Sequence, residues 1–305
     1  MKIIAVVVTF NRLPLLKRTI GCLQQAEALD KIVVVNNGST DGTHEWLDET
    51  AKSVSRLHVI HNANTGGAGG FATGMKRAYD LGAERIWCMD DDVFPRKGCL
   101  DALIAASHYP EAGIIVPRRI VEGEIFTTEF EEFDLTHTFA KTAIGHLKDR
   151  PVAEPTEISG AAFEGLFIKR EVVEAIGYPN ADLFIFYDDT DYCLRTRLAG
   201  FKIIYAPEAL IDKYKFFTDA SWLERTKAKR WKRFYQVRNG AWFHHHYGKT
   251  WGVRNLRSLN AMLGFMLPAL VLGLTTSAYK AGDAWRFIRA WRSGRRERLG
   301  RIKGV

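Results

Sequence analysis

Three consecutive aspartates, Asp90, Asp91 and Asp92, directly follow an apolar run of the sequence. Neighbouring carboxylates repel one another, and a packed fold has no need of three in a row. Their oxygens are the ligands that hard cations such as Mg²⁺ and Mn²⁺ prefer, and such ions commonly bridge carboxylates to substrate phosphates. A solvated loop with one helix cap is the alternative. The position of the aspartates after a buried strand favours a metal site.

A second carboxylate cluster, Asp188, Asp189 and Asp191, lies in the stretch "FYDDTDYCLR". Asp191 and Arg195 stand one helical turn apart, where an ion pair is an ordinary structural feature. Asp188 and Asp189 instead follow the apolar run "LFIFY" directly. Because apolar surroundings raise the pKa of a carboxylate towards working pH, these two residues are candidates for a general base.

The glycine-rich stretch "NTGGAGGFATG" is open to two interpretations. Gly67, Gly69 and Ala72 match the G-x-G-x-x-A dinucleotide fingerprint, which would indicate an NAD-dependent oxidoreductase. That fingerprint normally occupies the first strand–turn–helix of a fold, whereas this one is the third, and a ribose needs one acidic residue rather than three. We therefore expect these glycines to let the backbone approach a ligand closely, and keep the oxidoreductase as a remote alternative.

Strand and helix patterns alternate along the first part of the chain, which predicts an α/β fold with a Rossmann-like, mostly parallel sheet flanked by helices. Buried strands are expected over residues 2–10, 31–35, 56–62 and 85–89, and helices from Pro14, from a cap at Thr43, and over residues 75–81. Ligands bind beyond the carboxyl ends of parallel strands. The polar residues 9–12, 36–41 and 90–92 should therefore meet on one edge of the sheet.

Composition divides the chain into two parts. Residues 213–305 hold 21 lysines and arginines against 4 acidic residues, a balance of +17, whereas residues 1–212 hold 22 against 31, a balance of −9. We expect a catalytic domain over residues 1–217 and a helical, basic C-terminal region over residues 218–305. The four scattered cysteines form no C-x-x-C pair, which favours free thiols over disulfides or a zinc site.

The C-terminal region has the composition of a membrane-associated segment. Residues 258–279 carry no charge, and Pro268 with the flanking charges favours a helix that lies in the membrane interface over one that spans it. Trp285, Ile288 and Trp291 then alternate with arginines, as in helices on anionic membrane surfaces. A buried helix or a dimer interface is the alternative, so a homo-oligomer stays open. Nucleic acid is not an expected partner, because no recognition module is visible.

Six motifs occur in the order found in inverting family-two glycosyltransferases of the GT-A fold, and the chain resembles that family over residues 3–240. The motifs are "VVVTFNR", "VVVNNGSTDGT", "NTGGAGGFATG", "MDDDV", "ISGAAFEGLFIKR" and "FYDDTDYCLR". Within the family, the glycine-rich segment and both aspartate clusters look most like those of bacterial galactofuranosyltransferases, with rhamnosyltransferases close by.

The resemblance implies a site for a nucleotide-sugar donor, with a UDP-sugar favoured and dTDP-rhamnose as the alternative. Its residues would be Thr9, Phe10, Asn11, Arg12, Asn36, Asp41, Gly66, Gly67, Asp90 and Asp91. Asn36 would read the base edge through its amide oxygen, where relatives often have aspartate. Asp90 and Asp92, the ends of the family's D-x-D motif, would bind Mn²⁺ or Mg²⁺.

The resemblance also implies an acceptor site. Asp189 would be the catalytic base that deprotonates the acceptor hydroxyl, and Asp188 would orient the acceptor. Gly160 and Ala161 would form a close-approach wall of the same site.

One position departs from the family. Galactofuranosyltransferases that resemble this chain carry a metal-binding histidine shortly after the strand that ends here in "YAPEALIDK", where this chain has Asp212 and Lys213. An ammonium group cannot ligate a metal. Either Asp212 takes the role with a shifted register, or Lys213 contacts the diphosphate directly.

Together these features predict an inverting, metal-dependent hexosyltransferase that moves galactofuranose from UDP-galactofuranose to a cell-surface glycan or polyprenyl-linked acceptor. The expected location is the cytoplasmic face of the bacterial inner membrane, as a peripheral protein. A non-catalytic membrane-docking protein is a third class of function, and it would not need Asp90, Asp92 and Asp189.

Overall fold

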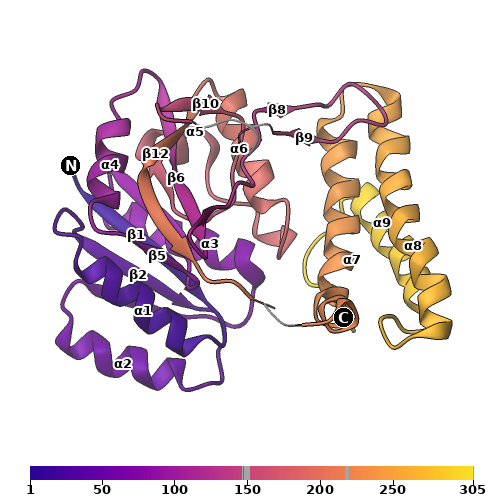
Figure 1. Cartoon of the computed structure of the whole chain (residues 1–305), viewed down its shortest axis with the longest axis horizontal. Coiled ribbons are helices and arrows are strands. Elements are labelled where there is room, and N and C mark those ends of the chain that lie inside the picture. The colour runs from indigo at the N-terminus through magenta and orange to yellow at the C-terminus, as the bar shows by residue number, and fades with distance from the viewer. Residues whose placement is uncertain (146, 148–151, 217–219, 305) are drawn as a thin grey trace. The chain divides into compact units, whose positions relative to one another are not determined.

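The computed structural model describes residues 1–145, 147, 152–216 and 220–304, and Figure 1 labels its elements. The chain forms two compact units. Unit 1 comprises Met1–Glu132, Gly145–Ala181 and Asp189–Lys215, and unit 2 comprises Phe133–Ile144, Asp182–Asp188 and Phe216–Val305. The C-terminal region expected from residue 218 thus belongs to unit 2, together with two short segments from earlier in the chain.

Unit 1 is built on one large mixed sheet. In spatial order its strands are β10 (Thr156–Ile158), β12 (Lys202–Lys213), β6 (Ala112–Val121), β11 (Leu166–Lys169), β4 (Arg85–Asp90), β1 (Ile3–Thr9), β2 (Lys31–Asn36) and β3 (Leu57–His61), with β5 (Val93–Pro95) on β12 and β7 (Glu124–Ile125) on β6. Strands β3, β2, β1 and β4 are parallel, as predicted. Strand β11 runs antiparallel to both β4 and β6, so the sheet is mixed beyond β4.

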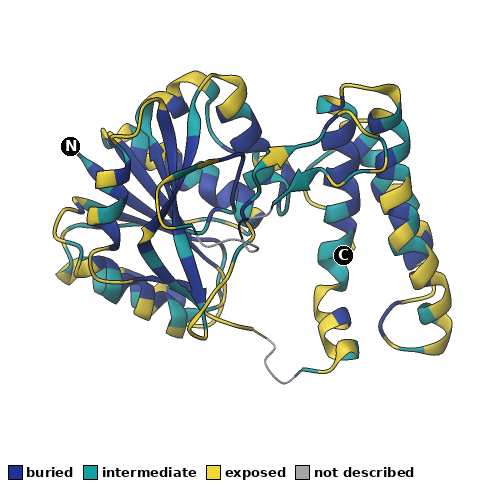
Figure 2. Cartoon of the chain, turned by 45° about the horizontal axis from the view of Figure 1, so that its top comes forward, coloured by how far each residue is buried: buried dark blue, intermediate teal, exposed yellow. Residues whose placement is uncertain are grey.

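Helices cover both faces of this sheet. One hydrophobic cluster includes side chains of α1 (Leu13–Gln24), α2 (Thr43–Ser53) and α4 (Cys99–Ala106). The other includes side chains of α3 (Gly66–Asp80), α5 (Arg170–Ile176) and α6 (Asp188–Leu198). Successive residues of β1 alternate between the clusters, which confirms a strand buried on both faces. Figure 2 shows the strands of the sheet as mostly buried.

Helix α3 begins at Gly66, so the predicted start at Met75 is wrong. The glycines of the first turns pack against the sheet. A Cβ atom on Gly70 would lie 2.5 Å from Val8 Cγ1, and one on Gly74 would lie 2.3 Å from Val6 Cγ1. Glycine disfavours helix intrinsically, but here its missing side chain lets the helix approach β1. Part of the glycine-rich signal therefore reflects packing.

The predicted cap at Thr43 is also wrong, because Thr43 is the first residue of α2 and Gly42 precedes it with a φ of 86°. Asp41 joins the two neighbouring helix starts. Its Oδ1 accepts a hydrogen bond from Thr43 Oγ1 at 2.6 Å, and its Oδ2 accepts one from the Leu13 amide at 3.0 Å. Thr43 thus stabilises the start of α2 through its hydrogen bond to Asp41.

Unit 2 is mostly helical, as predicted after residue 217. Its elements are the 3₁₀ turn η2 (Ala181–Leu183), α7 (Trp222–Tyr247), the π-helical segment η3 (Val253–Arg257), α8 (Ser258–Thr275) and α9 (Asp283–Arg295). A separate two-stranded sheet pairs β8 (Glu132–Phe133) with β9 (Ala143–Ile144). The tilted rings of Phe234 and Phe287 contact each other in the core between α7 and α9, with centroids 4.5 Å apart. Ser221 and Glu224 form a capping box at the start of α7.

Candidate active site

The carboxyl ends of β1 and β4 bring Thr9 and Arg12 to the triple aspartate. Thr9 Oγ1 donates a hydrogen bond to Asp91 Oδ2 at 2.7 Å. Arg12 Nη1 lies 3.0 Å from Asp91 Oδ1 and 3.4 Å from Asp92 Oδ2. Asp91 therefore uses both oxygens within the protein. Asp92, which Arg12 approaches at 3.4 Å, is held less closely than Asp91, and the assignment of a cation to Asp90 and Asp92 stays a prediction.

Strand β12 brings Lys213 to the same cluster. Its Nζ lies 3.3 Å from Asp92 Oδ1 and 2.7 Å from Glu164 Oε1. Asp212 instead makes a bidentate pair with Arg96, at 2.7 and 3.0 Å. Neighbouring residues of a strand point in opposite directions, so only one of the two can face the aspartates. Of the two residues, Lys213 is therefore the one that faces the aspartates, and its contact with the diphosphate stays a prediction.

Three charged residues that the sequence analysis missed complete the cluster. Glu164 lies just before β11 and pairs with both Lys213 and Arg119. Arg119 on β6 also pairs with Glu129, with Nη2 2.5 Å from Oε1, and both of these side chains are almost fully buried. Glu164 stands inside the apolar motif "ISGAAFEGLFIKR", and an acidic residue in such a stretch was the available signal.

The cluster carries more negative than positive charge. Among the described residues, five carboxylates (Asp90, Asp91, Asp92, Glu129 and Glu164) face three cations (Arg12, Arg119 and Lys213). Burial, followed by the charges of Asp92 and Glu164, raises the pKa of Asp90 well above its ordinary value, although Lys213 opposes this. With all five carboxylates ionised, as a bound cation would favour, the excess is two negative charges, which fits a hard divalent cation in both charge and ligand type.

Asp189 lies near the start of α6 in a setting suited to a base. Burial raises the pKa of its carboxyl group, and the charge of Glu164 adds to this. Hydrogen bonds from Thr190, whose amide lies 2.6 Å from Asp189 Oδ1, and the charge of Arg119 act in the opposite direction. A carboxylate with a raised pKa binds a proton more readily than one in water.

The backbone just before Asp188 is strained. Phe184, Phe186 and Tyr187 have φ values of 66°, 66° and 67°, a left-handed conformation that aromatic residues rarely adopt. Asn239 of α7 holds this segment within unit 2. Its Nδ2 lies 2.9 Å from each of three carbonyl oxygens, those of Leu183, Ile185 and Phe186. Strain that is held in place by such contacts is typical of functional sites.

The residues predicted to bind the nucleotide base lie at the carboxyl ends of β1 and β2. Phe10 is 44% exposed, which leaves its ring open to stacking. Asn11, with a φ of 54°, accepts a hydrogen bond from the Thr40 amide at 2.7 Å. Asn36 Oδ1 accepts one from the Ser39 amide at 3.0 Å, which leaves it one further lone pair.

Three glycines of the predicted site differ in their surroundings. Gly66 has a φ of 74°, and a side chain on Gly67 would meet no atom within 4 Å. Gly160 is enclosed, because a Cβ there would lie 2.4 Å from the ring of Phe130. Its neighbour Ala161 is buried. The roles of Gly160 and Ala161 in acceptor binding stay predictions, with packing as a second reason for small residues here.

A second group of metal-ligand types lies at α2 and the end of β3. Atoms of the exposed residues His44, Asp48 and His61 approach within 4.8 Å of one another. The imidazole of His61 already bridges Asp48 Oδ1 and Asn36 Nδ2, each at 3.0 Å. This arrangement positions Asn36, and it is separate from Asp90 and Asp92.

Comparison with known proteins identifies the family. Residues 4–177 match the model described as "Glycosyl transferase family 2". The chain is 28% identical over 215 residues to galactofuranosyltransferase GlfT1 of Mycolicibacterium smegmatis, covering 64% of this chain and 65% of that protein. It is also 26% identical to the N-acetylglucosaminyl-diphospho-decaprenol L-rhamnosyltransferase of Mycobacterium tuberculosis, covering 69% of this chain and 75% of that protein. The chain thus spans slightly less than two thirds of the length of GlfT1.

Among solved structures, that of GalNAc-T7 with UDP, GalNAc and Mn²⁺ has a similar fold, with a TM-score of 0.60 at 16% identity over 90% of this chain and 57% of that one. Because the family model covers more than half of the sequence, the chain belongs to glycosyl transferase family 2 and has a GT-A-like fold.

Proposed function

We propose that the protein is a metal-dependent, inverting glycosyltransferase that moves galactofuranose from UDP-galactofuranose to a hydroxyl of a bacterial cell-surface glycan or lipid-linked acceptor. The observation that carries this proposal is the excess of carboxylates around Asp90, with Asp189 coupled electrostatically to Glu164 of the same cluster. The named function of GlfT1 supports the choice of sugar.

Asp90 and Asp92 would hold Mn²⁺ or Mg²⁺, which would supply positive charge to the diphosphate of the donor as it leaves. The protein's own cations would assist. Arg12 and Lys213 already lie at Asp92, and both would orient the diphosphate through charged hydrogen bonds. Residues 9–12, Asn36, Asp41, Gly66 and Gly67 would bind the nucleoside, as the resemblance implies.

Asp189 would accept the proton of the acceptor hydroxyl at a carboxylate oxygen while that hydroxyl attacks the anomeric carbon. A single displacement from the face opposite the diphosphate inverts the configuration, so one base is enough. The strained segment before Asp188 would fix the direction of both carboxylates, with Asp188 orienting the acceptor. No covalent nucleophile is required.

We further propose that unit 2 attaches the protein to the cytoplasmic face of the bacterial inner membrane. Among the described residues, Val253–Thr275 is long and apolar enough to cross a membrane, and little of it is buried. Its partly exposed side chains and the arginines of α9 favour a helix in the interface. Contact with a second copy of the chain in a homo-oligomer is the other way in which these exposed apolar side chains could be covered.

Two other functions make different predictions. A dTDP-rhamnose-dependent enzyme would use the same residues with another nucleotide, and the similarity to a rhamnosyltransferase favours it as the second candidate. A non-catalytic membrane-docking protein would bind neither nucleotide. The match to glycosyl transferase family 2 excludes the interpretation as an NAD-dependent oxidoreductase.

The test is thermal unfolding of the whole chain with UDP or dTDP, each with and without Mn²⁺. A ligand at a hundred times its Kd adds about 2.7 kcal/mol to the free energy of unfolding. A Mn²⁺-dependent rise in Tm with UDP supports the proposal, and a larger rise with dTDP favours rhamnose. The absence of any nucleotide effect would argue for the docking protein.

A further inference from the structure

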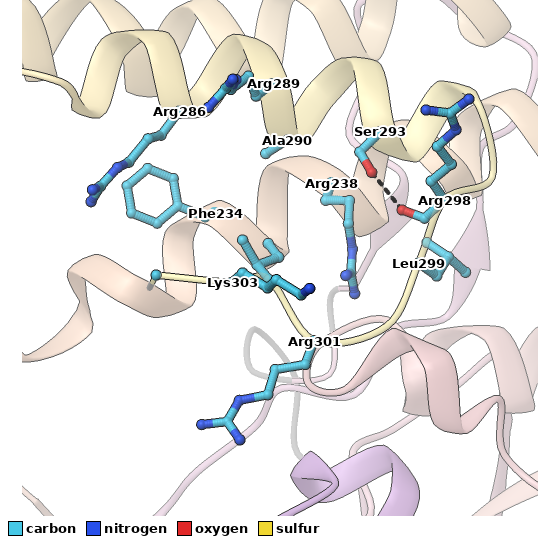
Figure 3. Close-up of a pocket in the computed structure, with 12 residues that line it drawn as sticks. Phe234, Arg238, Arg286, Arg289, Ala290, Ser293, Arg298, Leu299, Arg301 and Lys303 are labelled. Carbon is cyan, nitrogen blue, oxygen red and sulfur yellow. Dashed lines mark hydrogen bonds between the residues drawn. The ribbon is translucent and has the colours of Figure 1, made fainter.

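Unit 2 contains a basic pocket of about 380 Å³ between α7, α9 and the chain that follows α9. Six of its lining residues are cationic, and among the described residues that line it none is acidic. The cations are Arg238, Arg286, Arg289, Arg298, Arg301 and Lys303. In Figure 3, Arg286 and Arg289 extend from α9, Arg238 extends from α7, and the last three come from the C-terminal segment. The basic pocket therefore gathers positive charge from three parts of unit 2.

Arg238 is the innermost of these cations and is only 1% exposed. Its guanidinium group donates to the carbonyl oxygens of Leu183, at 2.8 Å, and of Gly300, while its Nε lies 2.7 Å from Asn239 Oδ1. All of these acceptors are neutral. Burial lowers the pKa of Arg238 to about 10, which shows that the charge is held at a cost.

The other five cations of the basic pocket also have few negatively charged partners. Among the residues that the structure describes, Arg289, Arg298, Arg301 and Lys303 form no ion pair. Arg286 lies 3.6 Å from Asp283, but that carboxylate already makes a bidentate pair with Arg230. Like charges gathered around one cavity repel, and guanidinium groups match the geometry of phosphate oxygens. The basic pocket is therefore suited to a phosphate or diphosphate group.

The exposed face of α8 indicates where such a phosphate would come from. In the same unit, Leu267, Leu270, Val271 and Leu274 are 47–85% exposed. Apolar side chains at this exposure fit acyl or prenyl chains better than water, and a basic pocket in the same unit fits the head groups of such lipids.

We propose that the basic pocket binds the phosphate or diphosphate head group of a membrane lipid. This inference rests on the proposed membrane association of unit 2, and it is independent of the transferase reaction.

The test measures binding of the full chain to phosphatidylcholine vesicles that contain either phosphatidic acid or oleate, adjusted to the same surface potential. Both additives are anionic, but only phosphatidic acid presents a phosphate. The pocket variant is Arg298→Gln/Arg301→Gln/Lys303→Gln. Its matched control is Arg225→Gln/Lys249→Gln/Arg296→Gln, which removes the same charge from exposed residues that do not line the basic pocket. Inorganic pyrophosphate is added as a soluble competitor.

We expect the wild-type chain and the control to prefer phosphatidic acid over oleate by about tenfold, since charged hydrogen bonds to phosphate add to general attraction. The pocket variant should bind both vesicles equally, and pyrophosphate should remove the preference. If the pocket variant and the control preferred phosphatidic acid over oleate to the same extent, the inference that the basic pocket binds a lipid phosphate would be overturned. The proposed membrane association and the transferase function would not be affected. Binding of pyrophosphate without any phosphatidic acid preference would reject the lipid as the source. Failure of the wild-type chain to bind any vesicle would overturn both this inference and the proposed membrane association, but not the transferase.

Discussion

Lys213 lies within ion-pair distance of both Asp92 and Glu164, and this contact defines the charge balance of the candidate active site. Burial lowers the pKa of the Lys213 ammonium, but the charges of Glu164 and Asp92 outweigh this and raise it, so the group stays protonated. At the position where the family resemblance implies a metal-binding histidine, this protein thus has a fixed positive charge. That charge should weaken the hold of the aspartates on a cation and strengthen the hold on a diphosphate.

Replacing Lys213 with methionine should therefore separate these two effects. We expect Lys213→Met to bind Mn²⁺ alone at least about tenfold more tightly, because unit charges 4 Å apart interact by roughly 4 kcal/mol at an effective dielectric of 20. UDP without metal should bind more weakly. Isothermal titration of each ligand measures both changes. Lys215→Met, which removes an exposed lysine paired with Glu122, is the control. Unchanged Mn²⁺ affinity in Lys213→Met would show that the ammonium does not share the cation site.

The raised pKa of Asp189 makes a prediction about pH. As a base the carboxyl group must be ionised, so kcat should fall as pH decreases through its raised pKa. The acidic limb of the kcat profile should therefore lie above the ordinary aspartate value of about 3.9. For stability the sign is reversed, since a raised folded-state pKa favours the folded protein at low pH. Profiles of kcat and Tm over the same pH range test both statements. A limb at or below the ordinary value would contradict the assignment.

At the scale of elements, the packing of α3 on β1 determines where the glycine-rich segment lies. Gly70 and Gly74 pack against Val8 and Val6, whereas at the start of the helix Gly66 is buried and Gly67 is half-buried with open space beside it. The glycines thus have two separable functions, close packing within the helix and an open backbone at its start.

Gly70→Ala should destabilise unit 1, because its Cβ would lie 2.5 Å from Val8 Cγ1. Overpacking of this kind costs about 1–3 kcal/mol. Gly21→Ala is the matched control within α1, where a Cβ would meet no atom within 4 Å. It should gain about 0.5–1 kcal/mol, as expected for alanine in a helix interior. Denaturant unfolding of both variants measures the difference. A Gly70→Ala protein as stable as wild type would mean that α3 does not pack this closely.

The parallel strands could be predicted because their side chains are apolar on both faces, a pattern that is local in sequence. The same pattern predicted where β1, β2 and β4 end. It therefore also predicted that Thr9 and Arg12 lie near the aspartates, as the structure shows. The cluster of Arg119, Glu164 and Lys213 could not be predicted, since it depends on the pairing of β6 with β11 and β12 across long sequence separations. The start of α3 was missed because glycine has low helix propensity and the compensating contact with β1 is tertiary.

At the scale of the whole molecule, the acidic and basic parts of the sequence fall largely into different compact units. Unit 1 contains the carboxylate clusters at Asp90–Asp92 and Asp189, and unit 2 contains the basic pocket and the exposed face of α8. This division suits an enzyme whose donor is soluble and whose acceptor is attached to a lipid. With the proposed membrane attachment in unit 2, that unit could change without altering the donor site.

Polar substitution on α8 should weaken membrane binding without unfolding unit 2. Val271 and Leu274 are 62% and 85% exposed, so Val271→Ser/Leu274→Ser should leave Tm unchanged. Its affinity for phosphatidylglycerol vesicles should fall by tenfold or more, since burying one such side chain is worth roughly 1.5–3 kcal/mol. Ile125→Ser/Leu198→Ser, which alters exposed apolar residues of unit 1, is the control for vesicle sedimentation. Equal loss in both variants would indicate that α8 does not contact the membrane.

The most direct test of the account is the release of UDP from UDP-galactofuranose by the wild-type chain and by Asp189→Asn, with binding of UDP and Mn²⁺ measured for both. Asp101→Asn, an exposed aspartate on α4, is the control. We predict acceptor-dependent UDP release by the wild-type chain and a loss of about 10²- to 10⁴-fold in Asp189→Asn, because a general base contributes that factor. Donor binding should be unchanged. Full turnover by Asp189→Asn, or no release by the wild-type chain with any glycan acceptor, would contradict the account.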